Sequence, residues 1–174
     1  LSALEALRAA GRYMNPPSLP DLIEAIRPQQ QGLAKGLEIF RSIDWPEHLK
    51  DFVDAVTRSA GYGLRAFESF EQALQAAQPA FVAYRAMGLT TKAIEALYPV
   101  AAMLPPVSRF YLEPDQRDNT ALLERLAGAN AGAQNVGLMH ANNGSDERGG
   151  FSVYVPEYYE GEALPLVMAL HGGS

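Results

Sequence analysis

The residues best suited to chemistry stand in one short turn, His171-Gly172-Gly173-Ser174, directly after the apolar run LPLVMAL (residues 164–170). Glycine has no side chain, so the backbone there can come close to a ligand and adopt conformations that other residues avoid. Backbone N–H groups held in such a turn could stabilise an oxygen that carries negative charge. The alternative is that Gly172 and Gly173 only let the chain leave a strand.

The three histidines are assigned neither to catalysis nor to a metal. His171 is expected to be a structural residue that shapes its loop. His140, in a predicted strand, and His48, in a predicted helix, lack acidic or histidine partners at ligand spacing, so no metal site is predicted. The absence of cysteine excludes disulfides, thiolate metal sites and a cysteine nucleophile. No cofactor is expected.

Composition limits the class of protein. The chain has 174 residues, of which 48% are hydrophobic and 20% charged, enough for one or two globular units. With a net charge of -6 and scattered basic residues, it offers no surface for nucleic acid or an anionic membrane. No apolar stretch reaches membrane-spanning length and the beginning does not resemble a signal peptide, so a cytoplasmic location is expected, although the sequence does not begin with Met.

The pattern changes once along the chain. Up to about residue 130 nearly every segment has helical spacing, and proline separates most of the segments. Asp44 and Glu47 form a start that resembles a capping box, while Gly61 and Gly63 are expected to break or bend the helix that follows. Predicted helices cover residues 1–13, 66–77, 80–87, 91–103 and 115–127. A further helix is expected to start near Asp21, and another follows the start at Asp44 and Glu47, with Phe52, Val53, Val56 and Ala60 on one face.

Seven aromatic residues of this helical region occur at helical spacing and are predicted to belong to its core. They are Phe40, Trp45, Phe52, Phe67, Phe70, Phe81 and Tyr84.

The last forty residues contain three runs with strand composition, separated by turn residues. Residues 135–140 and 150–156 are expected to pair as neighbours. Residues 164–170 are apolar without alternation, which is typical of a central strand covered on both faces by helices.

The segment GFSVYVPEYYEGEALPLVMALHGGS (residues 150–174) resembles the opening of the catalytic domain of α/β-hydrolase-fold serine esterases, in the phospholipase/carboxylesterase and polyester-depolymerase-like branch. There, a strand ending in Tyr-Val-Pro precedes a strand ending in His-Gly-Gly. LPPVSRFYLEP (residues 104–114) resembles the linker of esterases with a helical amino-terminal extension. The resemblance implies an α/β fold, with an irregular helical cap or side domain in residues 1–130 and the first strands of an α/β-hydrolase sheet, incomplete in this chain, in residues 131–174.

The resemblance also implies a site. The turn after the third strand supplies one oxyanion-hole donor in that family, a role carried here onto Gly173, with Gly172 as the neighbouring candidate. The chain contains no Gly-x-Ser-x-Gly sequence, so the nucleophile, acid and base are expected elsewhere and the chain alone should not hydrolyse anything. The expected partners are the carboxyl-terminal remainder of the same protein, after a break at Ser174, and a small-molecule ester.

Two functions remain open. The chain is either the amino-terminal part of a serine carboxylesterase, or a helical interaction or regulatory module that completes a partner's sheet. In the first case, Leu166–Leu170 should be paired on both sides. Exposure of these residues without a partner strand would overturn the interpretation of the chain as such a fragment.

Overall fold

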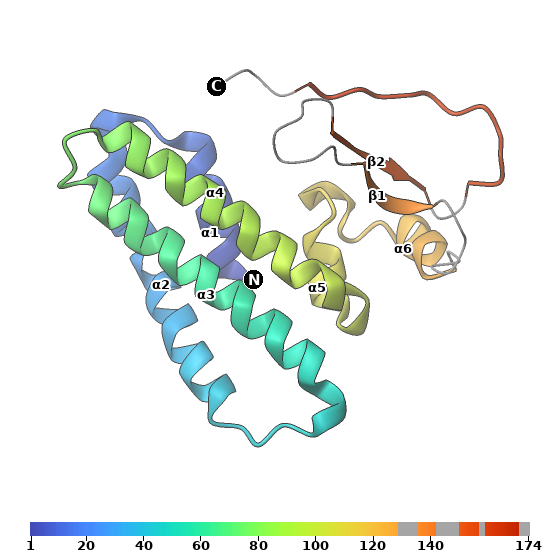
Figure 1. Ribbon diagram of the computed structural model, residues 1–174, viewed down its shortest axis with the longest axis horizontal. Helices are drawn as coiled ribbons and strands as arrows, with labels where there is room; N and C mark the ends of the chain where they lie inside the picture. Colours follow the sequence, from blue (N-terminus) through green and yellow to red (C-terminus); the bar gives the residue numbers. More distant parts are fainter. Residues whose placement is uncertain (129–135, 142–149, 157–158, 171–174) are drawn as a thin grey trace. The chain divides into compact units, whose positions relative to one another are not determined.

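Four long helices make up most of the part of the chain that the structure describes (Figure 1). The structure is a computed structural model, and it describes residues 1–128, 136–141, 150–156 and 159–170. The helices are α1 (Ser2–Tyr13), α2 (Leu19–Arg41), α3 (Lys50–Ala73), α4 (Pro79–Leu97), α5 (Pro105–Phe110) and α6 (Thr120–Ala127), with short 3₁₀ turns η1 (Pro16–Ser18), η2 (Glu47–Leu49), η3 (Tyr98–Met103) and η4 (Pro114–Gln116); the strands are β1 (Gly137–Ala141) and β2 (Phe151–Val155).

The chain divides into two units, residues 1–117 and 118–174. The first contains α1 to α5, and α2, α3 and α4 run alternately up and down beside one another (Figure 1). The second contains α6 and the two strands. The change of composition near residue 130, which predicts a domain boundary, falls in residues 129–135, outside the described part.

The first unit has its own hydrophobic core, drawn from α1 to α5. Leu7, Phe67 and Phe70 are the largest fully buried side chains of the described residues. The most extensive helix contact is that of α3 with α4, and both helices carry buried alanines: Ala55, Ala60, Ala66, Ala73, Ala83, Ala86 and Ala93. Small side chains allow two helix backbones to approach closely. In this contact Ser59 Oγ on α3 donates a hydrogen bond of 2.8 Å to the Ala93 carbonyl oxygen on α4.

Two helices run further than the spacing predicts. Gly61 and Gly63 lie inside α3, which continues through both to Ala73, so the prediction of a break there is wrong. The two predicted helices 80–87 and 91–103 belong largely to one helix, α4, which ends at Leu97. Burial of one continuous face against neighbouring helices stabilises these segments more than a glycine weakens them.

Three of the predicted core aromatics pack together where α2 and α3 are joined. The ring centroid of Phe40 lies 4.7 Å from that of Trp45 and 6.0 Å from that of Phe52. The indole N–H of Trp45 donates to the Phe40 carbonyl oxygen at 2.9 Å. By contrast, Phe81 and Tyr84 on α4 are 68% and 71% exposed, so their assignment to the core is wrong.

The second unit contains a hairpin where the sequence predicts two neighbouring strands. β1 and β2 pair antiparallel, with Gly137 opposite Val155 and Ala141 opposite Phe151. Gly137 has a φ of 80°, a left-handed conformation that favours glycine. Before the hairpin, α6 begins at Asn119, whose side chain accepts a hydrogen bond from the Leu122 backbone N–H at 3.1 Å.

The predicted fold class is wrong: the described protein is mainly helical and is not the start of an α/β-hydrolase sheet. The decisive segment is 164–170, which forms no strand. Its side chains are exposed, with Leu166 at 82%, Val167 at 87%, Met168 at 74% and Leu170 at 84%. An apolar run without alternation predicts a buried strand only when neighbouring strands and covering helices exist. The described residues supply neither for this segment, so the expectation that Leu166–Leu170 is paired on both sides is wrong for the described structure.

Candidate functional site

The predicted oxyanion-hole glycines, Gly172 and Gly173, lie outside the described residues, as do His171 and Ser174. Of the other histidines, His48 lies exposed in η2, and the backbone of His140 pairs with Ser152 in the hairpin. No group of three or more His, Cys, Asp or Glu side chains suited to a metal ion is present in the described part of the chain.

The segment that precedes Gly172 and Gly173 is itself a candidate for binding. Residues 164–170 have no hydrogen-bonded strand partner among the described residues, and their apolar side chains face water. An extended backbone with free N–H and C=O groups can add as a strand to another sheet. The segment therefore combines unpaired backbone groups with apolar side chains, which are the two features that strand addition uses.

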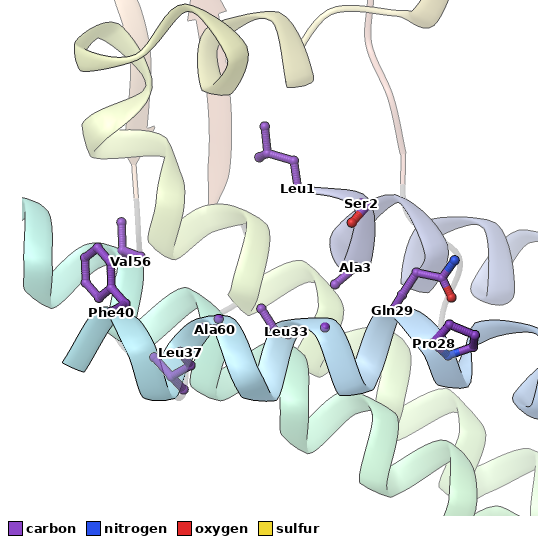
Figure 2. A pocket seen from close by; sticks show the side chains of 12 residues that line it. Leu1, Ser2, Ala3, Pro28, Gln29, Leu33, Leu37, Phe40, Val56 and Ala60 are labelled. Atoms are coloured by element: carbon purple, nitrogen blue, oxygen red, sulfur yellow. The ribbon is translucent and has the colours of Figure 1, made fainter. Parts of the chain in front are cut away.

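In the helical unit, an apolar groove of about 490 Å³ follows α2 between α1 and α3. Figure 2 shows Pro28 and Gln29 toward one end and Phe40 and Val56 toward the other, with Leu1 across the groove. None of its twelve lining residues carries a charged side chain. The side-chain oxygen of Gln29 is buried without a hydrogen-bond partner in the described structure. A buried acceptor without a donor costs free energy, so the side chain of Gln29 lowers the stability of this end of the groove.

A second cleft, of about 770 Å³, lies between α1 and α4, and charged side chains line part of it. Arginines from α1 and from the segment after η4 line it together with acidic and apolar side chains. The lining of this cleft includes Glu5, Leu7, Arg8, Gly11, Arg12, Met87, Thr90, Thr91, Ile94, Glu113 and Arg117.

Arg117 lines this cleft, and its guanidinium contacts both a side chain and the backbone. Its guanidinium forms an ion pair with Glu5 on α1. It also donates to the backbone carbonyl oxygens of Leu112 at 3.3 Å and Phe110 at 3.5 Å. Arg8 stacks over the Phe110 ring, with its guanidinium carbon 5.7 Å from the ring centroid. These contacts fix two arginine side chains at the edge of the cleft.

Near the cleft, Tyr111 ties α4 to the segment after α5. Its hydroxyl donates a hydrogen bond of 2.7 Å to the Ile94 carbonyl oxygen, and its ring meets the Tyr98 ring edge to face at 5.1 Å. Burial of the phenol, and secondarily the nearby Tyr98, raise the pKa of Tyr111 to about 12. The phenol therefore keeps its proton, and the hydrogen bond, well above neutral pH.

Sequence reasoning missed both cavities of the helical unit. Arg8 and Arg12 are separated from Met87 and Arg117 by several helices, and no local motif joins them. The signal that was available is limited to spacing, since Arg8 and Arg12 are four residues apart and therefore share a face of α1.

Comparison with known proteins gives no relative: no family model, curated protein or solved structure matches the chain. Among the described residues, no helix combines the length and the apolar composition that crossing a bilayer requires.

Proposed function

We propose that this chain serves as the amino-terminal part of a cytoplasmic serine carboxylesterase, which hydrolyses small carboxylic esters. The nucleophilic serine, the acid and the base would come from a further polypeptide segment, because the sequence contains no Gly-x-Ser-x-Gly. The contribution of this chain would be the turn His171-Gly172-Gly173, which follows the exposed apolar segment.

The resemblance of residues 150–174 to the opening of an esterase catalytic domain carries this proposal, whereas the exposure of segment 164–170, without a strand partner among the described residues, speaks against it. Burying a single Leu, Val or Met side chain is worth about 1.5–3 kcal/mol, so leaving four exposed is unfavourable. A further polypeptide segment that covers these side chains would remove this cost. Gly172 and Gly173, which follow in the sequence, would then be held beside the catalytic residues of that segment, as an oxyanion hole requires.

The chemistry assigned to the turn follows from the charge that develops during ester hydrolysis. Attack by serine converts the planar carbonyl carbon into a tetrahedral one, and its oxygen becomes negative. The backbone N–H of Gly173, or that of Gly172, would donate a hydrogen bond to this oxygen. A side chain at either position would obstruct the approach of the ester, which is why glycine suits both.

The test uses a fluorophosphonate probe, which reacts with activated serines, and p-nitrophenyl butyrate as substrate. Residues 1–174 alone are expected to remain unlabelled and inactive. The complete polypeptide encoded by the gene is expected to be labelled on a serine outside residues 1–174 and to hydrolyse the ester. Absence of both labelling and hydrolysis in the complete polypeptide would contradict the proposal.

The glycine role has its own variant. In the complete polypeptide, Gly173→Val should lower kcat by roughly 10²-fold, the usual effect of losing one oxyanion donor. Gly150→Val, at an exposed glycine of the same unit, is the matched control and should leave kcat unchanged. Normal turnover in a folded Gly173→Val protein would leave the glycines with a purely conformational role.

The second candidate function is a helical interaction module whose segment 164–170 adds to the sheet of an unrelated partner, and the same exposure favours it. The two candidates differ in what the segment binds. Labelling of a serine in the continuation of the same polypeptide supports the esterase, whereas an unlabelled polypeptide that forms a stable complex through residues 164–170 supports the module.

A further inference from the structure

The cleft between α1 and α4 has a lining unlike the rest of this acidic chain. Three arginines, Arg8, Arg12 and Arg117, meet there beside the apolar side chains of Met87 and Ile94. We infer that this cleft binds a monocarboxylate with a short apolar tail. The inference does not depend on the esterase proposal, since all of its residues belong to the helical unit of residues 1–117.

The charge of the cleft decides the charge of the ligand. Glu5 neutralises Arg117 through their ion pair, which leaves Arg8 and Arg12 against the single carboxylate of Glu113. The cleft thus keeps one net positive charge. A ligand with one negative charge neutralises it. The planar guanidinium also matches the two oxygens of a carboxylate.

Arg12 has guanidinium N–H donors that are available to bind a ligand. Among the described residues it has neither a hydrogen-bond partner nor an ion-pair partner, and it is exposed at the cleft. The hydroxyls of Thr90 and Thr91 do not compete for the anion, because they donate to the backbone carbonyl oxygens of Ala86 at 3.0 Å and Met87 at 3.2 Å. Recognition of the anion therefore falls to the arginines, and Arg8 is already positioned over Phe110.

The apolar part of the cleft suits an alkyl tail. Leu7 is buried beneath it, while Met87 and Ile94 are half-buried and keep part of their surface open. Gly11 lets α1 pass close to α4, since a Cβ atom there would lie 3.3 Å from Met87 Cγ. The flexible methionine side chain can adapt to the tail of a ligand. A volume of about 770 Å³ exceeds what an eight-carbon acid needs.

The test is a titration of the 174-residue protein with sodium octanoate, followed by isothermal calorimetry and by amide NMR shifts. Octanoate is expected to bind saturably, with shifts concentrated in residues 7–12 and 87–94. The probe 1-octanol, which lacks the charge, is expected to bind at least about tenfold more weakly, as expected for losing a charge-assisted hydrogen bond.

The variant Arg12→Gln should weaken octanoate binding by about tenfold or more, and circular dichroism checks that it stays folded. Arg58→Gln, at an exposed arginine of α3 that lines neither cavity, is the matched control and should bind octanoate as the wild type does. Three results would overturn the inference: no saturable binding, equal affinity for 1-octanol, or unchanged octanoate affinity in Arg12→Gln.

Discussion

At the scale of single residues, Tyr111 links local burial to the pH dependence of stability. Its pKa of about 12 in the folded protein lies above the ordinary value of 10.0, because burial disfavours the charged phenolate. The folded protein therefore binds the proton of this phenol more tightly than the unfolded chain does. Its contribution is fully present below about pH 10 and is lost as the pH rises toward 12, because the unfolded chain releases its proton first.

This residue yields a measurable difference between wild type and Tyr111→Phe. The variant loses the hydrogen bond to the Ile94 carbonyl oxygen and should be less stable by about 1 kcal/mol at pH 8. In urea denaturation between pH 8 and 11.5, that difference should stay constant to about pH 10 and then shrink. Tyr84→Phe, at a tyrosine that is 71% exposed, accounts for the titration of other groups. A difference that grows above pH 10 would contradict the assignment.

At the scale of elements, one glycine in each of two packed helices allows the effect of helix propensity on stability to be distinguished from the effect of side-chain packing. Gly36 in α2 has nothing within 4 Å of the position that a Cβ atom would occupy. In Gly63 of α3, that position lies 3.1 Å from Leu33 Cδ2, with Leu4 and Leu7 just behind. An added methyl group is therefore free at Gly36 and crowded at Gly63.

Gly36→Ala should raise the free energy of unfolding by about 0.5–1 kcal/mol, because alanine loses less backbone entropy in a helix than glycine does. Gly63→Ala has the same gain in propensity but must displace Leu33, so it should be no more stable than the wild type. Urea denaturation of the two variants side by side provides the measurement. Equal stabilisation of both would show that α2 and α3 are not held as closely at Gly63 as described.

At the scale of the whole molecule, the two units differ in the size of the hydrophobic core that each contains. Residues 1–117 contain the buried cluster centred on Phe67, Phe70 and Leu7, and those side chains are covered from within the unit. Residues 118–174 have a two-stranded hairpin and an exposed apolar segment. An isolated two-stranded hairpin is marginally stable in water.

Residues 1–117 produced alone should therefore fold, with a helical far-UV spectrum and a cooperative melt within a few degrees of that of the 174-residue chain. Residues 118–174 alone should show no cooperative transition. The comparison uses circular dichroism on the three polypeptides at equal concentration. A broad, non-cooperative melt of residues 1–117 would mean that the helical core requires the rest of the chain.

The buried face of α1 and the position where it ends could be predicted from the amino-acid sequence alone. The helical spacing of Leu4, Leu7 and Ala10 predicts the face of α1 that is buried, and the prolines after it predict where it ends. Both follow from forces that act within a few residues, which is why they could be read without the fold.

Contacts between distant segments determine whether a predicted strand is paired and which side chains line a cleft. The run LPLVMAL predicts a buried strand, yet the described residues offer it no neighbour, and it is exposed. In the same way, the arginines of α1 form a cleft only because α4 brings Met87 beside them. Strand pairing and cleft formation depend on contacts between distant parts of the chain, and residue spacing within one segment carries no information about them.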